Sequence, residues 1–453
     1  MSVLPLLLVA AVLAADAGFG LATDWLEGHP GLVALLAILP PIVIVLLVWL
    51  RCSVDARRIQ AGRFDVLPGA ALLMRVAQML VILNAITIIL LLDWLVIVRL
   101  QLGDMILLDE LIAILPGLGG LFFLGLAWFP LERAMAIRHG ASVRGPLSFA
   151  WSQFSIHVLL LLLPAMIILA SIETIEWLSS PQWGEESIQL FLLVAVVLVF
   201  LATPLLIRLV LSVKPIEEGS LRDRLEQVCT SHRVRIREIL LWRTGGLMIN
   251  AAVVGMIGRL RYVLLTDMLV RLLPEEQAEA VMAHEVGHVR FRHMQWLFLV
   301  IISLVLAVEA AMLPFNEQGG GLLHLGILMA VVWIGLGWVS RRFERQADTF
   351  AAVHFTHDQV DEPGSGVTLE AVTRVVGALQ AISCMNGDTT HRRSWRHGSI
   401  AFRCNNLEKL VGCPPDRLPI DRVVAWIKCA TVIVGVAALV ILITMSPGIV
   451  PDA

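Results

Sequence analysis

Nine stretches of the chain are long and apolar enough to cross a membrane, and they restrict the choice of fold. A membrane-spanning helix needs about 20 mostly apolar residues. The chain is 58% hydrophobic and 16% charged, with a mean hydropathy of +0.83, and a soluble core of this size cannot bury so much apolar surface. The sequence therefore predicts a mainly α, polytopic helical membrane protein. The predicted spans are 3–22, 31–50, 76–98, 107–129, 149–171, 188–212, 295–314, 321–340 and 425–446.

The distribution of arginine and lysine predicts the orientation of these spans. Basic loops alternate with loops that are short or acidic, and the basic ones include the two long polar segments 213–294 and 341–424. Cytoplasmic loops carry an excess of Lys and Arg, so we expect both polar segments in the cytoplasm. The net charge of −3 gives no reason to expect nucleic acid as a partner. Arginine is far commoner than lysine, which favours a GC-rich bacterial genome and hence the inner membrane.

A helix in the first polar segment carries the sharpest motif, His284-Glu285-Val286-Gly287-His288. Positions i and i+4 share a helix face, so both imidazoles can bind one metal ion. Glu285 is then placed to act as general base toward a water molecule. The alternative is an amphipathic helix with two hydrogen-bonded histidines, because so short a pattern also arises by chance.

A second helix supplies a third ligand. Glu344 and Asp348 lie one turn apart where the helix of span 321–340 continues into the cytoplasm. A catalytic zinc ion needs three protein ligands and one open position, and Glu344 completes the set. Asp348 is predicted to accept a hydrogen bond from a ligand histidine. The alternative is a solvated charged turn, with Arg341 and Arg342 as membrane anchors.

These motifs resemble the membrane zinc metalloproteases that include the type I CAAX prenyl proteases and the HtpX-like heat-shock proteases. The resemblance covers about 236–424. It rests on Ala278–His288, on Ser340–Asp348, on Leu264–Asp267 and on the pair Asn250-Ala251. The resemblance implies one zinc ion per chain, held by His284, His288 and Glu344, with Glu285 as the catalytic base. It also assigns Asn250 and Ala251 to substrate binding.

The family carries a further motif in which a His-Pro pair is followed by an arginine. Here His397 and Arg403 have the matching spacing, but Gly398 replaces the proline. The resemblance implies that His397 donates to the oxyanion of the transition state and that Arg403 positions substrate or structure. The alternative for His397 is one polar residue within the basic cluster His391 to Arg403.

The apolar spans and the two long polar segments also predict how the chain is divided. We expect an N-terminal transmembrane region over 1–212 with about six spans. A zincin-like domain follows over 213–424, interrupted by spans at about 295–314 and 321–340, and a last span and short tail occupy 425–453. Within the domain, 246–265 has β character and is predicted to form a small hairpin or meander.

The predicted activity is zinc-dependent hydrolysis of peptide bonds at the cytoplasmic face. The expected partners are a membrane-associated or misfolded polypeptide substrate and the lipid bilayer, and the oligomeric state stays open. A CAAX-type protease that trims C-terminal prenylated motifs is one alternative. It is favoured by the residues of the motifs, which resemble that group more. The bacterial composition argues against it, because protein prenylation is mainly eukaryotic. A signal transducer derived from a protease is the other alternative.

Overall fold

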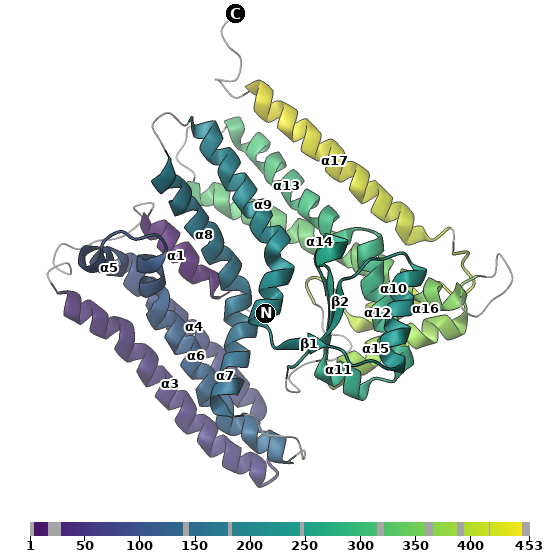
Figure 1. Cartoon of the computed structure of the whole chain (residues 1–453), viewed down its shortest axis with the longest axis horizontal. Helices are drawn as coiled ribbons and strands as arrows, with labels where there is room; N and C mark the ends of the chain where they lie inside the picture. Colours follow the sequence, from purple (N-terminus) through teal and green to yellow (C-terminus); the bar gives the residue numbers. More distant parts are fainter. Residues whose placement is uncertain are drawn as a thin grey trace, which may run out of the picture. The chain divides into compact units, whose positions relative to one another are not determined.

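The chain folds into two compact units, Met1–Ser212 and Val213–Ala453, in a computed structural model (Figure 1). The structure describes residues 4–16, 29–138, 145–179, 184–244, 249–314, 321–357, 366–386, 394–415 and 417–445. Both units are mostly helical, and the small β-sheet belongs to the second.

Eight helices in these ranges are long and apolar enough to cross a membrane, which makes the chain an integral membrane protein. They correspond to eight of the nine predicted spans. The first predicted span, 3–22, differs. Its described part is the 11-residue helix α1 (Leu6–Asp16), which is too short to cross a bilayer, and the remainder lies outside the described residues. The eight are Pro30–Gln60, Leu67–Leu91, Leu108–Arg138, Pro146–Leu178, Ser187–Val210, His293–Met312, Gly326–Thr356 and Pro419–Met445.

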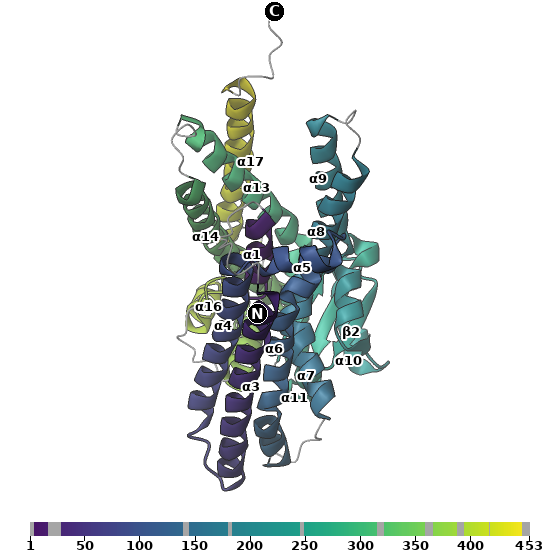
Figure 2. The same cartoon turned by 90° about the vertical axis from the view of Figure 1, so that its left-hand side faces the viewer.

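The first unit is built around three long helices that pack side by side, α3 (Pro30–Gln60), α4 (Leu67–Leu91) and α6 (Leu108–Arg138) (Figure 2). Gly120 on α6 allows the close approach, because a Cβ atom there would lie 2.7 Å from a methyl group of Val81. The other helices are α5 (Trp94–Leu102), α7 (Pro146–Phe154), the π-helical turn η1 (Ser155–Leu159), α8 (Leu160–Leu178) and α9 (Glu185–Val210).

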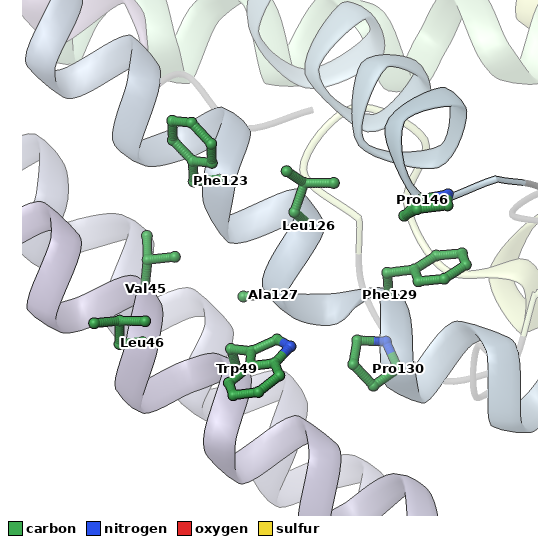
Figure 3. A pocket seen from close by; sticks show the side chains of 9 residues that line it. All are labelled: Val45, Leu46, Trp49, Phe123, Leu126, Ala127, Phe129, Pro130 and Pro146. Carbon is green, nitrogen blue, oxygen red and sulfur yellow. The ribbon is translucent and has the colours of Figure 1, made fainter.

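An apolar cavity of about 260 Å³ opens between α3, α6 and α7 (Figure 3). Trp49, Phe123 and Phe129 contribute its largest side chains. The lining contains no charged residue, as befits a surface that faces hydrocarbon.

Two charged residues predicted inside spans have partners near helix ends. Glu110 accepts from Arg99 at 2.6 Å, and the same guanidinium also contacts Asp16 and Asp109. Glu309 lies 3.1 Å from His324. Ionic groups at membrane depth are costly without a partner, so such pairing is expected.

The predicted span 76–98 is broken at Asp93. Helix α4 ends at Leu91, Asp93 has a left-handed φ of 47°, and α5 begins at Trp94. Aspartate tolerates this conformation better than most residues. The break divides the predicted span between a long helix and a short one.

The second unit contains a four-stranded sheet in the order β1-β2-β4-β3. Its strands are β1 (Val213–Pro215), β2 (Glu238–Trp242), β3 (Ala251–Val254) and β4 (Tyr262–Thr266). Strands β3 and β4 are the antiparallel hairpin predicted at 246–265, of which 246–248 lie outside the described residues. The parallel pairing of β2 with β4 and the antiparallel pairing of β1 with β2 extend it into a mixed sheet.

Helices pack around this sheet and form the core of the second unit. Val263 of β4, Met282 of α12 and Phe355 of α14 are fully buried in one apolar cluster. The helices are α10 (Ser220–Ser231), α11 (Asp267–Leu272), α12 (Glu275–Arg290), α13 (His293–Met312), α14 (Gly321–His357), α15 (Leu369–Met385), α16 (Ile400–Glu408) and α17 (Pro419–Met445).

A glycine brings α12 and α14 together at the level of the predicted site. A Cβ atom on Gly287 would lie 3.3 Å from the Cα of Ala347. Since most contacts of a real Cβ are longer, a larger residue at 287 would push the two helices apart. The predicted third ligand, Glu344, is carried on the helix that would move.

Candidate metal centre

Three predicted ligands meet where α12 packs on α14. His284 Nε2 lies 3.1 Å from His288 Nε2, and each nitrogen lies 3.6 Å from an oxygen of Glu344. Among the residues that the structure describes, these three form the one group of His, Cys, Asp or Glu side chains close enough to hold a metal ion.

The spacing of the three ligands fits zinc. Ligand atoms held tetrahedrally at about 2.0–2.1 Å from one ion lie roughly 3.3 Å apart, between the observed 3.1 and 3.6 Å. Two imidazoles and one carboxylate are also a donor set that zinc takes at catalytic centres. The His288 side chain is 25% exposed, so the site opens on one side. Burial lowers the pKa of His288 well below its usual value, which favours the neutral ring that binds metal.

Asp348 lies behind His284 and is itself held by Arg403. Asp348 Oδ1 lies 2.9 Å from His284 Nδ1, the place predicted for it. Arg403 of α16 donates to both oxygens of Asp348, from Nε at 2.8 Å and from Nη2 at 2.6 Å. Its third nitrogen, Nη1, lies 3.6 Å from Glu344. The guanidinium is buried within this arrangement, so Arg403 lies among the ligands.

Glu285 lies between the metal ligands and the edge of the sheet. The backbone N–H of Val253 on β3 donates to Glu285 Oε2 at 3.2 Å. Burial raises the pKa of the Glu285 carboxyl. A carboxylate with a raised pKa is a stronger base, which suits a group that must take a proton from water.

His397 reaches the same centre from a short loop. Its Nδ1 lies 2.9 Å from Glu344 Oε1, while about half of the side chain is exposed. Ser394 and Gly398 exchange backbone hydrogen bonds and close the loop. Gly398 has a φ of 75°, which a proline cannot adopt. The glycine therefore gives this loop a turn different from the one the resemblance implies, yet the histidine still meets Glu344.

Aromatic packing fixes that loop to α14. The Trp395 ring stacks on Trp333 with centroids 3.9 Å apart, and it lies directly over Gly337. Arg341 Nη1 donates to the Trp395 carbonyl at 2.8 Å. These contacts hold the loop that carries His397 against α14, the helix that carries Glu344.

Asn250 and Ala251 lie at the start of the edge strand β3. Asn250 faces β4, since its carbonyl accepts from Thr266 N–H at 3.0 Å. Backbone groups alternate along a strand, so Ala251 and Val253 face away from β4, and the bond from Val253 to Glu285 agrees. Tyr262 is buried on β4.

The contacts of His293 could not be predicted from its sequence position just after the motif helix. The residue is 1% exposed, and its ring stacks on Phe343 with centroids 4.3 Å apart. Its Nδ1 lies 2.9 Å from His288 Nδ1. The available signal in the sequence was the spacing of five residues between His288 and His293. That spacing alone does not bring the two rings together. They meet because α12 ends and the chain turns at Arg292, whose φ is 56°.

Comparison with known proteins agrees with this geometry. Residues 216–391 match the model of Peptidase family M48. The CAAX prenyl protease 1 homolog of Arabidopsis thaliana is 29% identical over 157 residues, which cover 30% of this chain and 37% of the relative. The match thus takes in little more than a third of that protein. A crystal structure of S. mikatae Ste24p aligns with 81% of this chain and 99% of its own length, at 16% identity and a TM-score of 0.45. The range that matches peptidase family M48 contains His284, His288 and Glu344.

Proposed function

We propose that this chain is a zinc-dependent membrane endopeptidase that cleaves membrane-associated or misfolded polypeptides at the cytoplasmic face. The convergence of His284, His288 and Glu344 at distances that fit zinc carries the proposal. The family match over 216–391 supports it.

The proposed mechanism gives separate roles to Glu285, to His397 and to the pair Asp348–Arg403. Zinc, when bound, would polarise the scissile carbonyl and make a water molecule more acidic. Glu285 takes the proton from the attacking water and returns it to the leaving amine. Arg403 fixes Asp348, which in turn orients the His284 ring. His397 supplies a donor for the negative charge that develops on the carbonyl oxygen.

The edge of β3 is the proposed binding site for the substrate. An extended peptide can add as a strand to an exposed edge and form main-chain hydrogen bonds there. Ala251 and Val253 direct backbone groups toward that position, and Glu285 is bonded to the same edge. A peptide bond beside β3 would therefore lie next to the base. Such recognition depends on the main chain, which suits misfolded substrates of varied sequence.

Metal analysis together with a cleavage assay tests the proposal. The purified full-length chain should contain zinc and degrade casein, and a chelator should stop degradation until zinc is restored. The similarity to a CAAX prenyl protease 1 homolog favours C-terminal trimming as the second candidate. Cleavage of a farnesylated CAAX peptide, with casein left intact, would establish that candidate instead.

His397→Ala is expected to lower turnover by about 10²–10³-fold, the usual cost of losing one oxyanion donor. A donor that acts in the transition state affects the catalytic rate more than ground-state binding, so the Michaelis constant should change little. Steady-state kinetics with a peptide substrate measures both. Asn405→Ala, a change at an exposed position on α16, is the control and should leave both constants unchanged. A near-normal rate for His397→Ala would remove the histidine from the mechanism.

The orientation of the site is tested by reporter fusions. Fusions near residues 220 and 360 should both report the cytoplasm, because the segments that carry the HExxH motif and Glu344 must lie on one side of the membrane to meet. A fusion after Pro451 should report the opposite side. Fusions at 220 and 360 that report different sides would contradict the proposed architecture.

A further inference from the structure

A line of side-chain hydrogen bonds connects the metal centre with the first turn of α17. It begins at His288, whose Nδ1 lies 2.9 Å from His293 Nδ1. His293 Nε2 lies 2.9 Å from Gln346 Oε1, and Gln346 Nε2 lies 2.6 Å from Asp421 Oδ1. His293 and Gln346 are 1% and 4% exposed. Because water hardly reaches these polar atoms, the bonds between them are strong and costly to break.

The Asp421 end sets the direction of every bond in the line. A carboxylate only accepts, so Gln346 presents its amide N–H groups to Asp421 and its carbonyl to His293. His293 must then donate from Nε2, which leaves its Nδ1 as an acceptor. His288 must therefore carry its proton on Nδ1.

This direction leaves His288 Nε2 without a proton. That nitrogen is the one that faces the other ligands, at 3.1 Å from His284 Nε2 and 3.6 Å from Glu344 Oε1. A neutral imidazole binds metal through its unprotonated nitrogen. The two ends of the line thus demand the same tautomer of His288.

We propose that His293, Gln346 and Asp421 are positioning residues that hold His288 in the tautomer and ring orientation that bind zinc. The inference rests on the zinc site of the proposed function. It gives each ligand histidine a support of its own, a carboxylate in direct contact for His284 and a relay that ends in a carboxylate for His288. Loss of such an outer partner typically weakens metal binding by about 10–100-fold.

An exchange of polarity within the relay tests its role. Gln346→Glu alone places two carboxylates 2.6 Å apart, so the contact with Asp421 should break and zinc affinity should fall by about 10–100-fold. Adding Asp421→Asn supplies an amide donor to the new carboxylate while His293 still finds an acceptor. The double variant should therefore return to within about threefold of wild type. Asp421→Asn alone should also lower zinc affinity, because the Asn amide can donate as well as accept and therefore no longer fixes the direction of the line.

Zinc affinity of the full-length protein in detergent is the readout, measured by competition with a chelator of known affinity, and proteolysis is not needed. The visible spectrum of the cobalt-loaded protein reports the coordination geometry independently. Gln227→Glu makes the same chemical change on the exposed face of α10 and should bind zinc as wild type does. If Gln346→Glu does not fold, Gln346→Met takes its place; it should lose the same affinity, and Asp421→Asn should not restore it.

Two results would overturn the relay. One is a Gln346→Glu protein that binds zinc as tightly as wild type. The other is a double variant that binds no better than Gln346→Glu. A wild-type chain that binds no zinc would refute the metal site itself, and so the proposed function, which separates that failure from failure of the relay alone.

Discussion

Glu285→Gln should reduce peptide hydrolysis by about 10²–10⁴-fold, the contribution of a well-placed general base. The amide keeps the shape of the side chain and can still accept the hydrogen bond from Val253 N–H. It cannot take a proton from water. Zinc content and folding should therefore match wild type while turnover is lost, and single-turnover kinetics with parallel metal analysis would show it.

Glu276→Gln is the matched control for this change, because Glu276 is exposed on the same helix. It should hydrolyse substrate at the wild-type rate. Wild-type rates for Glu285→Gln would show that another group activates the water. A Glu285→Gln protein without zinc would show instead that the carboxylate supports the metal site, and the assignment as base would then fail.

Replacing one metal ligand should lower the affinity for zinc by a factor as large as the loss of turnover expected for Glu285→Gln. His284→Ala and Glu344→Gln each leave two ligands of three, and we expect zinc affinity to fall by more than about 100-fold, since even outer partners are worth about 10–100-fold. Activity should disappear with the metal. Equilibrium dialysis against buffered zinc measures the loss directly.

Glu408→Gln, an exposed change on α16, serves as the control for metal content. Thermal unfolding should separate the ligand variants further. Binding to the folded state adds stability by mass action, so excess zinc should raise the unfolding temperature of wild type but not of the ligand variants. If both ligand variants still bind one zinc ion per chain, other residues hold the ion.

The sequence predicts the membrane helices well because their signal is local. Twenty apolar residues in a row report a span whatever the rest of the chain does. The errors occur where one residue or a distant partner decides. Asp93 ends α4 through a left-handed turn, and hydrophobicity does not detect such a turn. Helix α3 continues to Gln60, beyond the predicted 31–50, where Arg51 and Arg58 both pair with buried Asp55.

The sheet was predicted in part for a similar reason. The hairpin of β3 and β4 joins neighbours in sequence, and the run Tyr262–Thr266 is rich in residues that favour strands. Strand β2 pairs in parallel with β4, from Glu238 beside Tyr262 to Trp242 beside Thr266. Parallel pairing crosses a long connection, and no turn signal marks it.

At the metal centre, spacing along the sequence predicts which residues of a single helix lie on the same face. His284 with His288, and Glu344 with Asp348, are four residues apart, and the structure brings them together. The contacts of Arg403 with Asp348 and of His293 with Gln346 cross 55 and 53 residues. They depend on how helices pack, which no spacing rule contains.

Helix α14 runs without a break for 37 residues, from Gly321 through the apolar stretch to Glu344 and beyond. A helix advances about 1.5 Å and turns about 100° per residue. Deleting one residue between the membrane and Glu344 would rotate the carboxylate by more than a quarter turn relative to the embedded part. With the zinc site as proposed, the number of residues between the apolar stretch and Glu344 determines the distance of the site from the bilayer surface. We therefore expect a substrate to be cut only where its chain reaches that distance, whatever its sequence.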